Sequence, residues 1–505
     1  LRTIGDLSYS NAVQAAIPSP WTYARGTVLG VGATLVAALG PAFDAARSPP
    51  DAALRRAALE RRSRLRSRRA AALAPVVLLV GILLLAVAPR SLYPAFAGLF
   101  CVLGAGALAT PAVTAALMRL AEPAAGRGFG LAGLLAVRGV SASLSRTGVA
   151  TAALAVAVAT VIGIGLMISS FRASLTDWLH TTLTSDLYVT LDGAGPPITA
   201  DAMGRIASLP GVAGVSVTRY VLLPTDRGRI GLRAVSPGPN GWGLDLIAGE
   251  ANEALPALES RPVVAVSEPF AFRRRLAIGD ELLLPTPRGP MRFPIVAVYR
   301  DYDTGASSVL MSLAHYRAIW NDEGMDGLGV QLNDPRDARS VQAAVARLLP
   351  RGARLRSSQG IFELSLTIFD RTFRITDVLR VLAALIAFLG VLSALLSIQL
   401  EKAHELAVLR AIGLAPAELG RLVLIQTTLL GAAAGLCAMP IGAVLAGLLV
   451  HVINRRSFGW TMGLTLAPGP ILSGLALALA AAVLAGLYPA VRSARTNLAA
   501  ALREE

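Results

Sequence analysis

The sequence predicts an α-helical membrane protein of about seven spans, with an extracytoplasmic α+β domain inserted between the fourth span and the fifth. The first observation is composition: the 505 residues are 54% hydrophobic with a mean hydropathy of +0.59, which is too apolar for an ordinary soluble protein. The second is a set of apolar runs close to the ~20 residues that a helix needs to cross a bilayer. The third is the region 171–376, which holds no such run and in which arginines and carboxylates nearly balance.

The predicted spans are oriented by their flanking arginines. Their approximate boundaries are 22–43, 71–88, 92–118, 148–170, 377–399, 422–450 and 468–490. A dense basic block at 55–69 precedes the second span, and four further arginines separate the third from the fourth. Because cytoplasmic loops of membrane proteins carry an excess of lysine and arginine, both segments are predicted to be cytoplasmic. This places 171–376 and 451–467 outside. Arg455 and Arg456 fall on the outer side and do not fit this rule.

The net charge of +15 accompanies the membrane segments and does not indicate a nucleic-acid surface. Basic residues flank the apolar spans, so nucleic acid is excluded as a partner, and we interpret the block at 55–69 as a topology signal that binds anionic lipid head groups, in preference to a docking site for a specific partner. Cys101 and Cys437 lie inside apolar runs and the four histidines are scattered, so neither a metal site nor a catalytic site is predicted. No phosphate-binding loop of the Walker type is present, so no cofactor is expected on this chain.

The region 171–376 has the pattern of a folded α+β domain with two similar units. Each unit reads as a strand, an amphipathic helix and a second strand. The first comprises 186–190, 200–209 and 214–223, and the second comprises 328–332, 337–349 and 353–357. Between them, short strands at 263–266, 281–284, 293–299 and 308–311 are separated by turn residues and predict a small β subdomain inserted into the first fold.

Two segments connect this domain to the membrane. Span four continues as Phe171–Leu183, and Phe362–Phe373 leads into span five. We expect both to be helical stalks that deliver motion of the spans to the outer domain. The residues assigned to the stalks are Phe171, Trp178, Phe369 and Phe373.

Three local patterns have a functional and a plain structural interpretation. The cluster Asp301-Tyr302-Asp303 resembles a cation site, but the turn residues after it favour a solvated loop. The run Arg273–Arg275 could contact head groups or a partner, and a solvated helix face is the default interpretation. The pairs Gly26/Gly30 and Gly431/Gly435 have the small-xxx-small spacing that allows close helix packing, which alanine-rich spans also produce by chance.

A short charged segment, Gln399–Gln426, interrupts two apolar runs on the cytoplasmic side. Apolar residues return at helical spacing through its first half, which predicts a helix at the membrane surface. Gly413 ends this helix and Pro416 begins the next. We call this segment the hinge, because a protein docked there could tilt the spans on either side.

Three stretches of the chain resemble one protein family: EKAHELAVLRAIGLAPAEL in the hinge, YPAVRSARTNLAAALREE at the end, and VVAVSEPFAFRRRLAIGDELLLP in the outer region. They resemble the FtsX-like permease family, the membrane subunits of MacB-type ABC transporters. The hinge sequence EKAHELAVLRAIGLAPAEL resembles the family's R-x-x-E-x-A-x-L-R-A-I-G segment, although Gln399 and Lys402 stand where an arginine often begins it. The ending YPAVRSARTNLAAALREE resembles the family's terminal sequence. The stretch VVAVSEPFAFRRRLAIGDELLLP resembles the periplasmic domain of the two-module, ten-span, YbbP-like branch.

An internal repeat supports this resemblance, because Pro20–Arg55 aligns without gaps on Pro468–Arg503. The resemblance divides the chain into the last span and tail of a first FtsX module (1–57), two linker spans with basic loops (58–146), the first span of the second module (147–170), a MacB-like periplasmic core (171–376) and a three-span module (377–505). We expect this chain to be N-terminally truncated, with three further spans and another outer domain preceding it.

The resemblance implies a non-catalytic permease subunit in the bacterial inner membrane, with its large domain on the periplasmic side. A separate ABC ATPase subunit of the lipoprotein-release type would bind ATP and dock on the hinge, and mechanotransmission would drive extraction, release or export of lipids, lipoproteins or hydrophobic compounds. Membrane lipids and a periplasmic protein would be the other partners. The residues assigned to ATPase coupling are Glu401, Glu405, Leu409, Arg410, Ile412 and Gly413. The alternatives are an FtsX-like regulator that transmits force to a periplasmic cell-wall hydrolase, and a membrane-anchored sensor without an ATPase.

Overall fold

The computed structural model describes residues 19–46, 56–191, 198–226, 228–302, 308–350, 352–401 and 415–495. The chain divides into two compact units. The unit that we call the sheet unit contains Met167–Thr376 and Gly447–Leu466, and the helical unit contains Ala12–Leu166, Asp377–Ala446 and Ala467–Glu505. Helices α4, α10 and α12 each contribute residues to both units.

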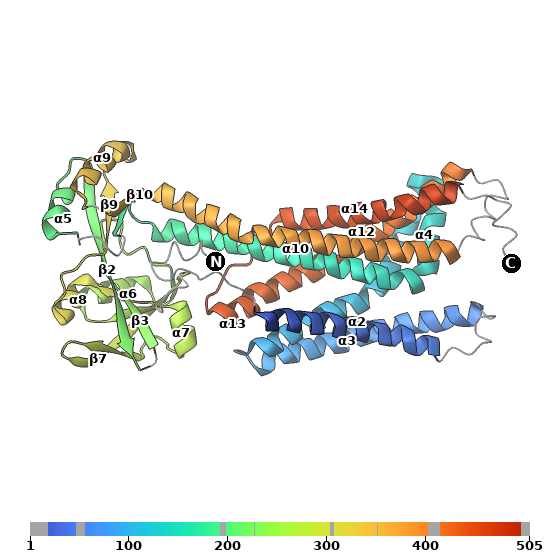
Figure 1. The fold of residues 1–505 in the computed structure, drawn as a ribbon, viewed down its shortest axis with the longest axis horizontal. Helices are drawn as coiled ribbons and strands as arrows, with labels where there is room; N and C mark the ends of the chain where they lie inside the picture. The colour runs from blue at the N-terminus through green and yellow to red at the C-terminus, as the bar shows by residue number, and fades with distance from the viewer. Residues whose placement is uncertain are drawn as a thin grey trace. The chain divides into compact units, whose positions relative to one another are not determined.

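Long helices match the predicted spans (Figure 1). They are α2 (Pro20–Ala46), α3 (Arg56–Val87), α4 (Leu92–Thr182), α10 (Ser358–Glu401), α12 (Pro416–Leu448) and α14 (Pro468–Arg495). Among the described residues, five stretches are long and apolar enough to cross a membrane: Arg69–Val87, Leu92–Gly128, Thr147–Thr182, Pro416–Phe458 and Pro468–Tyr488. They confirm five of the predicted spans. The other two, 22–43 and 377–399, lie within α2 and α10, and their role as spans stays a prediction.

The predicted cytoplasmic segment between the third and fourth spans is largely helical. Helix α4 runs through it, with one break at Gly130, whose φ of 60° and ψ of −144° are not helical. The short apolar stretch Ala132–Ala142 follows this break. Arg138 Nε donates to Glu122 Oε1 at 2.7 Å, so an ion pair links the two sides of the break.

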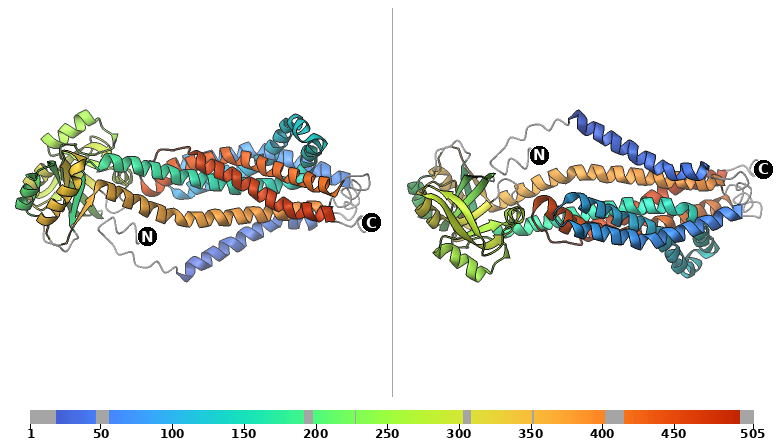
Figure 2. Two further views of the ribbon diagram at one scale, coloured as in Figure 1. Left: turned by 90° about the horizontal axis from the view of Figure 1, so that it is seen from above. Right: turned by 90° about the horizontal axis from the view of Figure 1, so that it is seen from below.

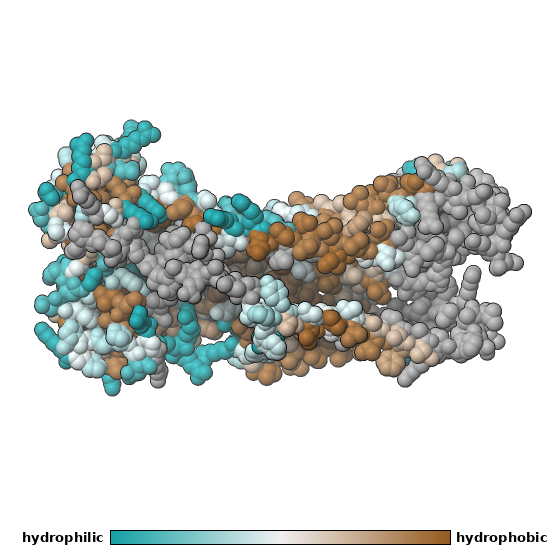
Figure 3. Space-filling view, viewed as in Figure 1, coloured by the Kyte–Doolittle hydropathy of each residue, from teal (hydrophilic) through white to brown (hydrophobic). Residues whose placement is uncertain are grey.

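Glycines permit close packing of α12 on α14 within the helical unit. A Cβ atom at Gly431 would lie 2.4 Å from the Cβ of Ala482, and one at Gly435 would lie 2.7 Å from a methyl group of Leu475. Of the two interpretations of this pair, the structure therefore supports close helix packing. At Gly26 and Gly30 an added Cβ would meet no described atom within 4 Å, so that pair makes no close contact. The surface of the long helices is mainly hydrophobic in Figure 3, as lipid contact requires.

The sheet unit is built on ten strands. They are β1 (Leu187–Leu191), β2 (Val212–Thr225), β3 (Gly228–Ser236), β4 (Leu246–Ala248), β5 (Val264–Ser267), β6 (Glu281–Thr286), β7 (Gly289–Tyr299), β8 (Ser308–Ser312), β9 (Gly327–Leu332) and β10 (Ala353–Ser357). Their order is β10-β1-β9-β2-β3-β8-β5-β7-β4, with β6 paired to β7. Both predicted strand–helix–strand units are present, since α5 (Ala200–Ala207) follows β1 and α9 (Ala338–Leu348) follows β9.

The prediction of a separate β subdomain was wrong, because the intervening strands belong to the same sheet. The long strand β2 pairs with β9 through Val212–Thr218 and with β3 through Val217–Thr225. Strand β3 then pairs in parallel with β8 and so extends the sheet into the middle strands. Sequence reasoning missed β3 because its arginines and glycines (GRIGLRAVS) interrupt the alternation of apolar residues.

Helices cover both faces of this sheet. Val264 and Val266 of β5 belong to the larger core cluster, which also includes side chains of α5, α9, α7 (Glu268–Arg274) and α8 (Leu313–Trp320). Ala265, between them, belongs to a second cluster with α6 (Ala251–Ser260). Because side chains alternate between the faces of a strand, α6 covers the opposite face.

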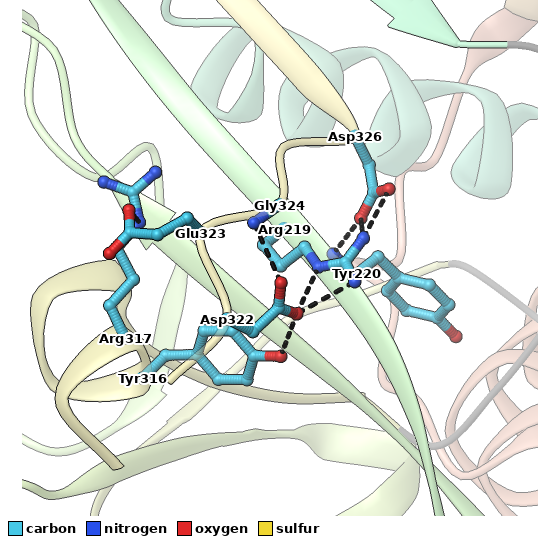
Figure 4. A network of polar contacts seen from close by, with 8 residues as sticks. All are labelled: Arg219, Tyr220, Tyr316, Arg317, Asp322, Glu323, Gly324 and Asp326. Carbon is cyan, nitrogen blue, oxygen red and sulfur yellow. Dashed lines mark hydrogen bonds and ion pairs between the residues drawn. The ribbon is translucent and has the colours of Figure 1, made fainter. Parts of the chain in front are cut away.

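A polar network fixes the segment before β9 against β2 (Figure 4). Arg219 of β2 donates from Nε to Asp322 Oδ2 at 2.9 Å and from Nη1 to Asp326 Oδ1 at 2.9 Å. Tyr316 of α8 donates its hydroxyl proton to Asp322 Oδ2 at 2.7 Å. Burial opposes ionisation of Asp322, but hydrogen bonds from Tyr316, Gly324 and Arg219 and the charge of Arg219 outweigh it and lower the pKa of Asp322. The network therefore holds Asp322 ionised.

Candidate functional site

The two predicted stalks are joined side by side within the sheet unit. The end of α4 and the beginning of α10 run next to each other in both views of Figure 2. Phe171 meets Phe369 and Phe373 edge to face, with ring centroids 5.2 and 5.9 Å apart. An ion pair between Arg172 and Asp370 adds a charged contact beside these rings. The structure thus brings three of the four predicted stalk residues together.

The fourth predicted stalk residue, Trp178, packs on Tyr302, the centre of an aromatic cluster. The rings of Phe171, Trp178 and Trp460 lie 5.9, 5.7 and 5.6 Å from that of Tyr302. Trp178 Nε1 donates to the carbonyl oxygen of Arg300 at 3.1 Å. Tyr302 is 8% exposed, and burial raises its pKa to about 12, so its hydroxyl stays protonated and remains a donor.

The preference for a solvated loop at Asp301-Tyr302-Asp303 was wrong for its first two residues. Asp301 is 3% exposed and its Oδ2 lies 3.7 Å from Arg233 Nη2, while Tyr302 lies in the aromatic cluster. Asp303 lies outside the described residues. Charge and turn propensity could not show the burial, because the residues that cover Tyr302 come from distant parts of the chain.

The residues that complete the cluster come from the segment after span six. Helix α12 is followed by the π-helical turn η3 (Leu449–Asn454) and by α13 (Arg455–Phe458). Residues 459–466 then run without helix or strand, and we call them the docking loop. Trp460 in this loop is 4% exposed, and it exchanges two hydrogen bonds with Asn454, at 3.0 Å and 3.2 Å.

Side chains of α4 and α7 satisfy the backbone of the docking loop. The amide of Thr461 donates to Glu268 Oε2 at 2.8 Å. Further along, the amide of Gly463 donates to Ser174 Oγ at 3.1 Å, and that of Thr465 donates to Ser170 Oγ at 2.9 Å. Two more hydrogen bonds involve Thr461: its hydroxyl lies 3.1 Å from Glu268 Oε2, and its carbonyl oxygen accepts from the Tyr302 hydroxyl at 3.1 Å. The loop is therefore held at alternate residues along its length.

Glu268 is the charged group of this site. It is the first residue of α7 and only 7% exposed. Burial raises the pKa of its carboxyl group, although hydrogen bonds from Thr461 and the charges of Arg300 and Arg455 oppose the rise. We call the assembly of stalk aromatics, Tyr302, Glu268 and docking loop the joint. Its parts are held together by packed aromatic rings and hydrogen bonds.

Sequence reasoning missed Tyr302, Trp460, Glu268 and Thr461 as members of the site. One signal could have pointed to part of it: Phe458 and Trp460 lie at the predicted outer end of span six, where aromatic side chains gather in membrane proteins. Glu268 carried no such signal, because its partner lies 193 residues away. Among the described residues, no group of three or more His, Cys, Asp or Glu could hold a metal ion.

The predicted ATPase-coupling residues lie mostly outside the described part of the chain. Glu401 is the last residue of α10. The other five, Glu405, Leu409, Arg410, Ile412 and Gly413, are outside the described residues. Helix α12 begins at Pro416, as predicted, and the Glu418 carboxylate accepts from the amide of Ala415 at 3.0 Å at its start. The coupling role of all six residues stays a prediction.

Two regions of the chain match known protein families. Residues 147–348 match the MacB-like periplasmic core domain, and residues 378–498 match the FtsX-like permease C-terminal domain. The resemblance inferred from the sequence is therefore confirmed, and so is the fold class of a helical membrane protein with an inserted outer domain. In the joint, Tyr302 comes from the MacB-like region and Trp460 from the FtsX-like region.

The chain is also similar to several known proteins. The chain is 36% identical over its whole length to an uncharacterized ABC transporter permease protein of Mycobacterium tuberculosis, and it spans 60% of that protein. It is 24% identical to the lipoprotein-releasing system transmembrane protein LolC of Neisseria meningitidis, over 65% of this chain and 82% of LolC. The crystal structure of the periplasmic region of MacB from Actinobacillus actinomycetemcomitans aligns over 37% of this chain and 94% of that one, with 11% identity and a TM-score of 0.27.

Proposed function

We propose that this chain is part of the permease subunit of an ABC transporter in the bacterial inner membrane. A separate ATPase would bind and hydrolyse ATP, and the permease would convert its motion into work on the outer face. That work would be extraction, release or export of a lipid, a lipoprotein or a hydrophobic compound. The permease among the relatives supports this assignment, and the LolC relatives favour an ATPase partner of the lipoprotein-release type.

The observation that carries this proposal is the joint. It joins Tyr302 and Glu268 to the ends of three membrane-associated segments: the end of α4, the start of α10 and the docking loop after α12. A transmission device needs such a contact, because tilting one helix must displace the elements packed against it. Each aromatic pair contributes about 0.5–1.5 kcal/mol beyond its buried area, so the several pairs in this cluster resist separation.

The hinge is the proposed input for this motion. It joins the end of α10, which carries the stalk residues Phe369 and Phe373, to the start of α12, which leads to the docking loop. An ATPase docked on the hinge would therefore act on α10, which reaches the joint, and on α12, which leads to the docking loop. In this mechanism the chain supplies binding and transmission, and bond cleavage takes place on the ATPase.

The experiment uses the full-length permease, reconstituted in nanodiscs with the ATPase that co-purifies with it. The variant Arg410→Glu with Glu405→Lys reverses two charges of the hinge. Two quantities are measured: stimulation of ATP hydrolysis, and hydrogen exchange in the docking loop with and without ATP and vanadate. We expect the variant to abolish both the stimulation and the nucleotide-dependent change in exchange.

The matched control is Glu122→Lys with Arg138→Glu, which reverses an ion pair in the other predicted cytoplasmic segment. This variant should keep both responses. Unchanged stimulation in the hinge variant would remove the hinge from the mechanism. If no ATPase co-purifies with the permease and the permease stimulates ATP hydrolysis by none, the proposal of a transporter fails. The sensor alternative then gains support.

A further inference from the structure

A basic and aromatic surface lies beside the joint, formed by two short helices of the sheet unit. Helix α7 ends in Arg273 and Arg274, and Arg275 is its C-cap in the left-handed conformation, with a φ of 60°. Helix α13 contributes Arg455 and Arg456. These two helices and the C-cap together contain five arginines and one carboxylate, Glu268. We call these five arginines, together with Phe458, the basic patch.

The two helices are in direct contact, although they are about 180 residues apart in sequence. The Cζ atom of Arg455 lies 5.8 Å from the ring centroid of Phe272 in α7. A Cβ atom at Gly459, the C-cap of α13, would lie 3.0 Å from the Cα atom of Pro269. The hydrogen bonds between Glu268 and Thr461 fix the same two elements. Their arginines therefore belong to one surface.

The position of α13 along the chain sets the depth of this surface. The apolar stretch Pro416–Phe458, long enough to cross the bilayer, ends within α13. Phe458 is 51% exposed and stacks on Trp460, with ring centroids 5.0 Å apart. Exposed aromatic rings at the end of a span lie at the level of the lipid head groups. Since α7 contacts α13, we expect Arg273 and Arg275, both exposed, to reach the same level.

We propose that the basic patch binds the phosphate of anionic phospholipid head groups in the outer leaflet. The positive charge of the patch is complementary to the negative charge of this ligand. A guanidinium group can also donate two parallel hydrogen bonds to two oxygens of one phosphate. The surface over α7 is largely hydrophilic in Figure 3. The proposal also explains why Arg455 and Arg456 lie on the outer side against the positive-inside rule: they are part of a lipid-binding surface and are not a topology signal.

The test places a photo-crosslinking group in the patch. The full chain, with Phe458→p-benzoylphenylalanine, is reconstituted in nanodiscs of equal phosphatidylglycerol and phosphatidylcholine, and the crosslinked lipids are identified by mass spectrometry. We expect phosphatidylglycerol to be favoured by about fivefold and high salt to reduce this preference. The variant with Arg273→Gln, Arg275→Gln and Arg455→Gln should lower it to within about twofold of the bulk ratio.

Two control variants and one measurement separate the effect of losing the patch charge from an effect on folding. Arg336→Gln, Arg339→Gln and Arg347→Gln remove three exposed arginines around α9 in the same unit, and the preference should stay intact. Replacing the three patch arginines by lysine keeps the charge and should keep most of the preference. The amide exchange of Thr461 should be unchanged in the glutamine variant if the joint remains folded.

Three results would overturn the proposal. The first is crosslinking at the bulk lipid ratio in the otherwise unmodified chain. The second is a preference that the three patch substitutions do not change. Crosslinking in cells to an acidic protein in place of lipid would assign the patch to a protein partner and would also contradict it.

Discussion

The contact between Glu268 and the docking loop can be tested by removing the carboxylate. Glu268→Ala leaves the amide of Thr461, which now donates to Oε2 at 2.8 Å, without its acceptor. Glu268→Gln keeps an oxygen at the same place and removes only the charge. The two variants therefore separate the hydrogen bond from the electrostatics of the buried carboxylate.

The magnitude follows from the burial of the site. Glu268 is 7% exposed, so water reaches the orphaned amide only when the loop opens. A buried donor without a partner costs about 1–3 kcal/mol, which corresponds to an increase of about 5- to 150-fold in the opening equilibrium. We expect Glu268→Gln to change this equilibrium by less than about tenfold, because the acceptor remains.

The pH dependence has a defined sign. The pKa of Glu268 is raised above its ordinary value of 4.5, chiefly by burial. Its contribution to the stability of the closed loop is therefore fully present below pH 4.5 and is lost as the pH rises through the raised value. Protection of Thr461 should fall across that interval in the unmodified chain, and Glu268→Gln should abolish the fall.

The assay is hydrogen exchange of the full chain in nanodiscs, with protection factors corrected for intrinsic rates. The peptide that covers Thr461 reports the opening equilibrium. Glu259→Ala removes another carboxylate of the sheet unit, which accepts from Trp242 Nε1 at 3.0 Å, and should not affect Thr461. Unchanged protection of Thr461 in Glu268→Ala would show that the contact does not hold the loop closed.

Further predictions concern the stability of the sheet unit and of the helical unit, each taken by itself. Arg219→Met should destabilise the sheet unit by about 1–3 kcal/mol, between the values for exposed and buried ion pairs, because the Arg219 and Asp322 side chains are 27% and 30% exposed; thermal unfolding followed by tryptophan fluorescence measures it. The lowered pKa of Asp322 means that this network contributes above pH 3.8 and is lost as the pH falls through the folded-state value, so the variant should lose less stability than the unmodified chain on acidification. In the helical unit, Gly431→Ala should destabilise by about 1–3 kcal/mol, since its Cβ would lie 2.4 Å from that of Ala482. Gly26→Ala should be neutral or stabilise by up to about 1 kcal/mol, and equal melting temperatures for the two variants would contradict the packing argument.

Features that depend on residues close together in the sequence could be predicted, and features that depend on residues far apart could not. Spans and most strands were found because the period of apolar residues is a local property, as in the strand at 328–332, which the structure forms as Gly327–Leu332. The stalk residues were found because α4 and α10 continue directly from apolar runs. Tyr302 and Thr461 were missed because their contact joins residues 159 positions apart, and no local pattern encodes such a pairing. Residues 402–414 of the hinge lie outside the described residues, so the role of the hinge rests on its sequence.

Helix α7 links the joint to the basic patch, because its first residue, Glu268, binds the docking loop and its last turn carries the patch arginines. If anionic lipid binds the patch more tightly when α7 is docked on the loop, thermodynamic linkage requires the same lipid to favour docking by the same factor. Anionic lipid should then increase the protection of the Thr461 amide, and the three glutamine substitutions in the patch should remove this increase without changing protection in phosphatidylcholine alone. Equal protection in both lipids would show that the patch and the joint act independently, even though one helix carries both.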